Sequence, residues 1–216
     1  MSSIAQWRAC RCSKNLPTTR RLSACWRKRS MDAPCESSLS SCCLILHFVL
    51  WPEHDRGLTN FCRWLAHTQS MRWHAHYPTS GTGPIYQGRF QSFAVESDEH
   101  FYTVCRYVER NPLRAKLVQR AEDWHWSSLW RRIHGDDQPR NFLCPWPLPR
   151  PEDWIAYVNA PQTDSEWEVL RCCVQRGCPF GSPRWQKPLA ARLGLSHTLR
   201  PLGRPKKAPP QEDATA

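Results

Sequence analysis

The sequence predicts a fold that combines β-strands with α-helices, and three stretches carry this prediction. Residues 44–51 are rich in β-forming apolar side chains and stop at Pro52, which is typical of a buried strand. Residues 58–76 repeat apolar side chains with helical spacing. Residues 97–111 show the same spacing behind a serine that suits a helix start. We therefore expect a strand and two helices in this order, with short strand-like pieces at 85–95 between the helices.

The strand over residues 44–51 contains a histidine among apolar residues. Because side chains alternate between the two faces of a strand, one face receives Ile45, His47, Val49 and Trp51. A histidine in such a place is more often a satisfied residue of the sheet than a metal ligand. Its spacing alone therefore favours a structural role.

The helix over residues 97–111 places a tyrosine and an asparagine one turn apart. Ser97 is the expected N-cap, and Pro112 is expected to end the helix. The core stripe consists of Phe101, Val104, Cys105 and Val108. Tyr107 and Asn111 are separated by four residues, so they project from the same side of the helix. A phenol beside an amide oxygen suits a tyrosine nucleophile that attacks a phosphodiester near a metal ion, although such a pair is commonly structural.

The composition favours a polyanionic partner. The 216 residues carry a formal net charge of +11, mostly from arginine, and 12 tryptophans accompany them. Such a surplus favours nucleic acid first and an anionic membrane surface second. The alternative is a basic protein whose charge serves solubility. Tryptophans between arginines could stack unpaired bases, but most tryptophans are core residues.

The cysteines and the longest apolar run indicate in which cellular compartment the protein is expected. The sequence has 12 cysteines, but no pair of C-x-x-C knuckles. A small zinc-binding nucleic-acid protein built on the N-terminal cysteines is therefore a minor alternative. The apolar run at 42–51 is too short to span a membrane and lies too far along the chain for a secretory signal. We expect a cytoplasmic protein with free thiols and no membrane partner.

The chain divides by composition into five parts. Residues 1–43 are rich in Ser, Arg and Cys and show no clear element, whereas residues 44–135 carry the strand and helices described above. Residues 136–151 contain five prolines and are expected to be a stiff linker. Residues 152–198 hold two short helical patterns, a small helical extension, and residues 199–216 form a basic tail expected to be disordered.

Four blocks within residues 47–135 resemble one protein family. They read His47-Phe-Val-Leu-Trp-Pro52, Tyr86-Gln-Gly-Arg-Phe90, Arg106-Tyr-Val-Glu-Arg-Asn-Pro-Leu-Arg-Ala115 and Ala121-Glu-Asp-Trp-His-Trp-Ser-Ser128. Their content and order resemble the single-tyrosine HUH transposases, and more narrowly the REP-associated tyrosine transposases of bacteria. The resemblance implies an α+β fold, with a ferredoxin-like antiparallel sheet, helices on one face and a helical C-terminal extension.

The resemblance also implies roles for three residues. Tyr107 would be the nucleophile, and His47 and Asn111 would be ligands of Mg²⁺ or Mn²⁺. The substrate would be single-stranded or hairpin DNA derived from a repeat. Attack would give a 5′-phosphotyrosine and a free 3′-hydroxyl, and the stored phosphodiester energy would allow strand rejoining without a nucleotide cofactor. Monomer and dimer both stay open, since family members differ in how many subunits build the site.

One departure from the family pattern affects this chemistry. The family carries two histidines two residues apart on one strand, and the position two before His47 holds Ile45, which has no lone pair. The unfamiliar residues 1–43 end at the same place. We therefore expect a displaced reading frame or a degenerate copy there, with a genuinely divergent N-terminus as the alternative, and strand cleavage to be impaired.

Arginines near the predicted site are candidate DNA contacts. They are Arg89, Arg106, Arg110 and Arg114, with Arg204 in the tail. Gly203-Arg204-Pro205 resembles the centre of a minor-groove-binding hook, although a solubilising tail is an equal alternative. The sequence thus predicts a transposase-type, DNA-binding protein with a metal-dependent tyrosine nucleophile. The alternatives are a remnant that binds hairpin DNA without cutting it, and a chain that fails to fold.

Overall fold

The computed structural model describes most of the chain. It covers residues 2–8, 35–42, 45–52, 56–77, 85–86, 88–135, 143 and 145–200, the first two stretches and Ile45 by backbone alone. Within these residues, strands and helices are combined as expected, and the α+β prediction is confirmed at this level. None of the helices in the described part of the chain is long and apolar enough to cross a membrane.

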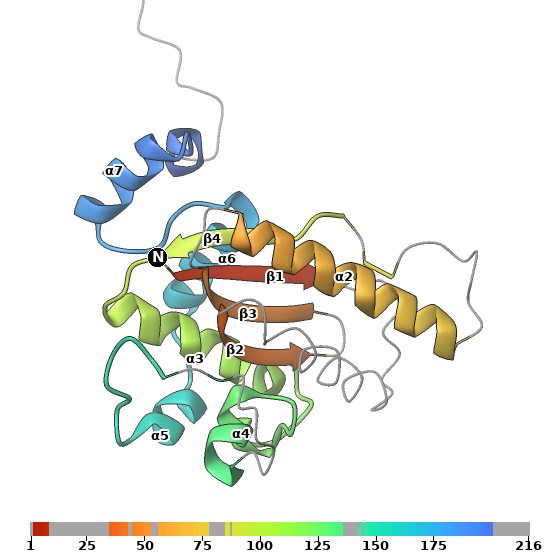
Figure 1. The fold of residues 1–216 in the computed structure, drawn as a ribbon. Helices are drawn as coiled ribbons and strands as arrows, with labels where there is room; N and C mark the ends of the chain where they lie inside the picture. The colour runs from red at the N-terminus through yellow and green to blue at the C-terminus, as the bar shows by residue number, and fades with distance from the viewer. Residues whose placement is uncertain are drawn as a thin grey trace, which may run out of the picture.

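Four antiparallel strands form one sheet (Figure 1). The strands are β1 (Ser2–Arg8), β2 (Cys35–Cys42), β3 (Ile45–Pro52) and β4 (Gln91–Val95). Their order across the sheet is β2-β3-β1-β4, so β3 lies inside it. His47 is paired with Gln6 of β1 and with Ser40 of β2, which fixes its position in the middle of the sheet.

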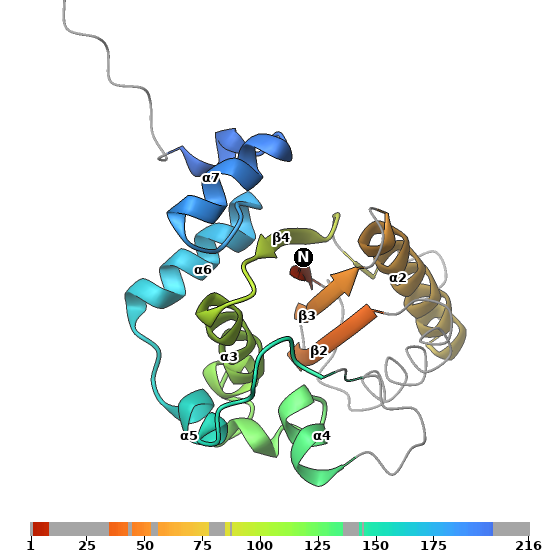
Figure 2. The same cartoon turned by 60° about the vertical axis from the view of Figure 1, so that its left-hand side comes forward.

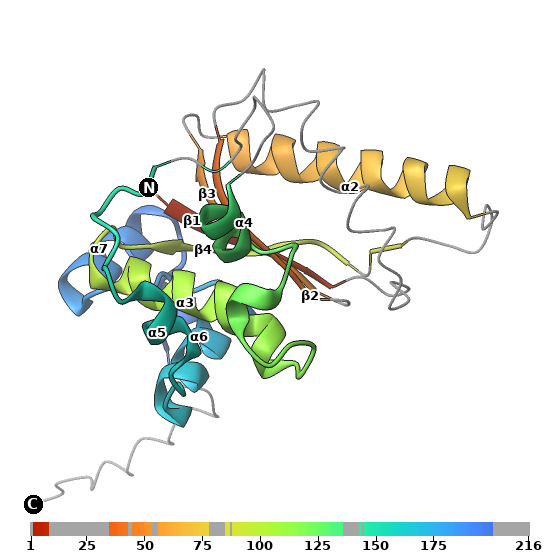
Figure 3. The ribbon, with the colours of Figure 1, turned by 90° about the horizontal axis from the view of Figure 1, so that it is seen from below.

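Helices cover both faces of this sheet, so the expectation of helices on one face is wrong. Leu46, Phe48 and Leu50 of β3 pack with Phe61 and Leu65 of helix α2 (Gly57–His76). Val49 belongs instead to the core around helix α3 (Glu99–Arg114). Figures 2 and 3 show α2 and α3 on opposite sides of the strands. The physical reason is the unbroken apolar run of β3, which is buried on both faces and needs a cover on each.

The described parts of the first 43 residues, 2–8 and 35–42, form two strands that the sequence did not reveal. Both β1 and β2 pair with β3, and β1 also pairs with β4. The segment Cys35–Cys42 is serine-rich and lies at the edge of the sheet, where one side of the backbone is unpaired. Pattern-based reasoning depends on apolar alternation, whereas this pairing is made by the backbone. The origin of the segment, displaced frame or divergence, stays a prediction.

Helix α3 differs at both ends from its sequence pattern. Asp98 is the N-cap in place of Ser97, and its carboxylate accepts a hydrogen bond from the His100 N–H. Pro112 lies inside the helix, which continues to Arg114. The last turn still closes, because the Ala115 N–H donates to the Asn111 carbonyl at 2.9 Å. A proline this near the C-terminal end removes one donor without breaking the helix.

Part of the proline-rich segment and of the helical extension packs against α3. The α-helices that follow α3 in the described residues are α4 (Ser128–His134), α5 (Trp154–Asn159), α6 (Asp164–Arg176) and α7 (Pro183–Arg192). Trp146 packs edge-on against Phe101 of α3 and Trp154 of α5. In the described part of residues 136–151, Trp146 is therefore packed against α3 and α5. A count of prolines predicts stiffness, but it does not show that an aromatic side chain of the same segment is packed.

Glu109 joins α3 to the elements that follow it. Its side chain is fully buried. One carboxyl oxygen accepts from the Ser128 hydroxyl at the start of α4, and the other accepts from the Trp154 indole N–H at 2.7 Å. Buried polar groups need such partners, so this carboxyl fixes α4 and α5 to α3.

Replacing Glu109 by alanine should leave the buried donors of Ser128 and Trp154 without an acceptor. We expect the free energy of unfolding to fall by about 3 kcal/mol, as measured by urea denaturation. Glu109→Gln is the matched control, because its amide can accept from Trp154 and donate to Ser128. Equal losses in the two variants would contradict this role of Glu109.

The Glu109 carboxyl should also shape the pH dependence of stability. Burial raises its pKa above the ordinary 4.5, although hydrogen bonds from Ser128 and Trp154 oppose the rise. As the pH rises above 4.5, the unfolded state loses the proton before the folded state does. We expect the unfolding free energy of the natural protein to fall relative to Glu109→Gln over this rise. If the difference in unfolding free energy between the two proteins did not change with pH, the raised pKa of Glu109 would be refuted.

Candidate functional site

The structure brings His47, Tyr107 and Asn111 together at the contact between β3 and α3. The His47 and Tyr107 ring centroids are 5.6 Å apart, and the rings are nearly perpendicular at 89°. The Asn111 amide nitrogen lies 2.8 Å from the His47 Nδ1 atom. Strand alternation directs His47 toward α3, and the four-residue spacing on α3 directs Tyr107 and Asn111 toward His47. The three residues singled out from the sequence thus form one cluster.

A chain of hydrogen bonds runs through this cluster from the surface into the sheet. The Arg114 guanidinium donates to the Asn111 Oδ1 atom at 3.0 Å. Because a guanidinium can only donate, the amide oxygen faces Arg114 and the amide NH₂ faces His47. The His47 Nδ1 atom must then accept, so the proton of the neutral ring lies on Nε2.

His47 is neutral in this environment. It is 1% exposed, and burial lowers the pKa of His47 from 6.5 to about 3, with a further lowering by the nearby Arg114 charge. The Nε2 atom is buried and has no hydrogen-bond partner among the side chains that the structure describes. At neutral pH the imidazole is therefore an uncharged ring whose Nδ1 atom accepts from Asn111 and whose proton lies on Nε2.

Tyr107 is largely but not completely enclosed. Its exposed fraction is 8%, and burial raises the pKa of its hydroxyl above 10. The positive charges of Arg114 and Arg171 partly offset this rise, which shows that both guanidinium groups act on the phenol. At neutral pH the phenol keeps its proton.

The residues around His47 do not fit a divalent cation. The Nδ1 atom is engaged by Asn111, the Nε2 atom carries the proton, and the amide oxygen accepts from Arg114. Mg²⁺ and Mn²⁺ prefer oxygen ligands with open lone pairs, and a neighbouring guanidinium repels them. Position 45, on the same face of β3, holds an isoleucine. The ligand set predicted from the sequence is therefore occupied by hydrogen bonds within the protein.

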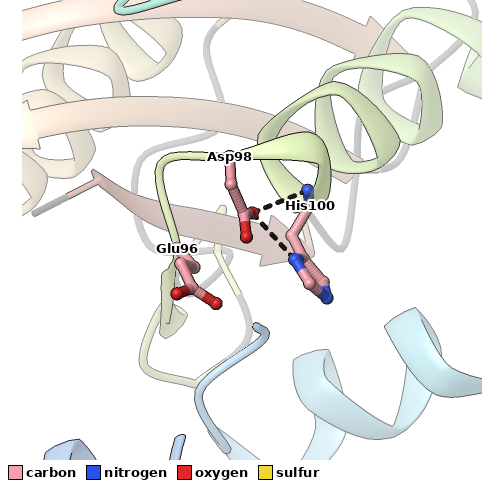
Figure 4. A group of neighbouring side chains, drawn as sticks. All are labelled: Glu96, Asp98 and His100. Atoms are coloured by element: carbon pink, nitrogen blue, oxygen red, sulfur yellow. Dashed lines mark hydrogen bonds and ion pairs between the residues drawn. The ribbon is translucent and has the colours of Figure 1, made fainter. Parts of the chain in front are cut away.

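A second group of metal-type side chains lies at the start of α3. Atoms of Glu96, Asp98 and His100 lie within 4.8 Å of one another (Figure 4). Each carboxylate already has a structural partner: Asp98 accepts from His100, and Glu96 accepts from the Ser182 N–H at 2.6 Å. These hydrogen bonds hold the N-terminal ends of α3 and α7 in place. They explain why the three side chains lie close together.

Two of the predicted DNA-contacting arginines hold the protein together instead. Arg106 is 5% exposed and donates to the carbonyls of Ala160 and Pro161, so its guanidinium is engaged within the protein and its contact with DNA stays a prediction. One guanidinium nitrogen of Arg110 donates to the carbonyls of Val158 and Asn159. The carbonyl oxygens at the end of α5 accept hydrogen bonds from both guanidinium groups. The spacing of these arginines in the sequence did not indicate such partners.

The other candidate arginines have different surroundings. Arg89 and Arg114 are exposed, and their contact with DNA stays a prediction. Arg204 lies outside the described residues.

Sequence reasoning missed the contribution of helix α6. The guanidinium groups of Arg114 and Arg171 lie over the Trp167 ring of α6, with their central carbons 5.4 Å and 5.1 Å from the ring centroid. The four-residue spacing of Trp167 and Arg171 was available in the sequence, but nothing in it linked α6 to Tyr107. The link depends on the way the extension folds back along α3.

Comparisons with known proteins give a fold and no family. No protein-family model matches the chain, and no curated protein matches its sequence. A solved structure described as a REP-associated tyrosine transposase bound to a REP hairpin is similar at a TM-score of 0.51. It has 19% sequence identity, over 64% of this chain and 82% of that chain. The chain therefore shares the fold of that protein.

Proposed function

We propose that this protein is a transposase-type DNA-binding protein that binds single-stranded or hairpin DNA and is impaired in strand cleavage. The observation that carries the proposal is the Tyr107 phenol held beside His47, whose metal-binding atoms are engaged within the protein. The first part of this observation supports descent from a tyrosine-nucleophile enzyme. The second part supports the loss of its chemistry.

Several features support DNA as the partner. The similar structure is described as bound to a REP hairpin, and the net charge of this chain is +11. The antiparallel strand order β2-β3-β1-β4 fits the ferredoxin-like arrangement implied by the four sequence blocks. Exposed Arg114 lies one turn beyond Asn111 on α3 and donates to its side chain. Positive charge at this place suits a phosphate backbone.

The chemistry of Tyr107 explains the proposed impairment. Attack on a phosphodiester requires the phenol to lose its proton while the P–O3′ bond breaks. Burial raises the pKa of Tyr107, and His47 offers no free lone pair, because Nδ1 accepts from Asn111 and Nε2 carries the proton. A divalent ion would polarise the phosphate, but the residues present do not fit one.

An active transposase is the second candidate. The contact of His47 with both Tyr107 and Asn111 favours it, since these are the residues on which the family's chemistry would depend. It requires the Asn111–Arg114 hydrogen bond to open when DNA arrives.

Incubation with labelled hairpin DNA and Mn²⁺ separates the two candidates. We expect a shifted complex in native gels and no adduct that survives denaturation, because the phenol has neither a base nor a metal beside it. Tyr107→Phe is the matched variant and should bind like the natural protein. A denaturation-resistant adduct that disappears in Tyr107→Phe would establish the active enzyme, and absence of any shift would reject DNA binding.

The proposal also requires the His47 imidazole to stay neutral well below its ordinary titration range. Its folded pKa, about 3, lies below the unfolded value of 6.5, so the unfolded state takes up the proton first as the pH falls. The unfolding free energy should therefore fall between pH 6.5 and about pH 3.

The variant His47→Gln keeps an acceptor for Asn111 and should lack this component of the slope. Nitrogen-15 NMR should report a proton on Nε2 at pH 6. A His47 ring that titrates near 6.5 would contradict the hydrogen-bond assignment.

A further inference from the structure

Two exposed arginines and a tryptophan meet beside Tyr107, from helices that are far apart in the sequence. Arg114 ends α3, whereas Trp167 and Arg171 lie one turn apart on α6. The guanidinium carbons lie 5.4 Å and 5.1 Å from the centre of the Trp167 ring. We name these three residues the Arg–Trp–Arg cluster.

The charges of the cluster are not neutralised within the protein. No ion pair to Arg114 or Arg171 is present among the described residues. Arg114 spends one donor on Asn111, and Arg171 makes no hydrogen bond with another described residue. Acidic residues do occur on α6, but Glu166 faces the buried Arg106 at 3.7 Å. The cluster therefore presents two fixed positive charges with most donors unused.

The Trp167 side chain is also incompletely satisfied. Its indole nitrogen is buried and has no hydrogen-bond partner in the described structure. A buried N–H without an acceptor is unfavourable, so an incoming acceptor at this place would be stabilised. A phosphate oxygen or a base edge has the required lone pairs.

The position of the cluster connects it to the phenol. Arg114 is linked to the phenol through Asn111 and His47, because it donates to Asn111, whose amide contacts the His47 ring beside Tyr107. The charges of Arg114 and Arg171 also oppose the effect of burial on the Tyr107 pKa. An anionic group bound by Arg114 would therefore lie at the end of α3 that carries Asn111. The N–H fork of a guanidinium group can donate to the two non-bridging oxygens of a phosphodiester, and an indole face stacks on bases of any sequence.

We propose that Arg114, Trp167 and Arg171 bind a phosphodiester group of a DNA strand beside Tyr107, and that this binding needs no divalent cation. The inference rests on the proposed DNA-binding function and names the site through which it acts. The positive charges of Arg114 and Arg171 would neutralise the bound phosphodiester, as a metal ion would otherwise do. Helix α6 thereby becomes part of the DNA-binding surface.

A salt titration of hairpin-DNA binding in EDTA tests the site. Arg171→Ala should weaken binding about five- to tenfold at low salt and lower the slope of log Kd against log salt by about 0.7–0.9, the contribution of one phosphate contact. Arg63→Ala is the matched control, because Arg63 is exposed on α2 at the opposite face of the sheet. Adding Mn²⁺ should leave the affinity of the natural protein unchanged within twofold.

A double-mutant cycle tests whether both arginines hold the same phosphate. Arg114→Gln keeps an N–H for Asn111, and Arg171→Ala removes the second charge. If they share one phosphate, the double variant should lose less affinity than the product of the two single losses. Independent, multiplying losses would overturn the shared site. Circular dichroism melts of each variant verify that the fold persists.

The outcomes separate this inference from the proposed function. No binding of hairpin DNA by the natural protein would reject the proposed function itself. Binding that Arg171→Ala weakens no more than Arg63→Ala does would reject the Arg–Trp–Arg cluster and leave DNA binding intact. Binding abolished by EDTA and restored by Mn²⁺ would reject the metal-independent site.

Discussion

The hydrogen-bond chain from Arg114 through Asn111 to His47 determines what the rest of this site can do. It joins the last turn of α3 to the middle strand of the sheet, and it runs in one direction because a guanidinium offers only donors. That direction fixes the orientation of the amide and the tautomer of the imidazole. The two atoms that would have to be open to bind a metal ion are thus engaged in a polar link between sheet and helix.

Helix α3 also contacts the elements that follow it in the chain. Three of its other side chains make these contacts. Arg106 and Arg110 donate to carbonyls at the end of α5, and Glu109 accepts from Trp154. The helix whose motif resembles that of a nucleophile helix thus also binds the C-terminal elements of the structure. Its arginines differ in their surroundings: Arg106 is buried, whereas Arg114 is exposed and donates to Asn111.

Sequence reasoning located the cluster but not its chemistry. The strand around His47 and the helix around Tyr107 follow from apolar spacing and from the four blocks, and their contact follows from the implied fold. The strands Ser2–Arg8 and Cys35–Cys42 did not follow, because backbone pairing leaves no apolar signature. The tautomer of His47 and the approach of Trp167 depend on side-chain orientation across residues more than fifty positions apart, which no local pattern encodes.

The central claim is that the His47 and Asn111 atoms able to bind a metal ion are engaged within the protein. A calorimetric titration of Mn²⁺ into the protein, alone and saturated with hairpin DNA, tests it most directly. The account predicts no saturable binding that depends on His47 or Asn111. Stoichiometric Mn²⁺ binding that is lost in both His47→Ala and Asn111→Ala would contradict it.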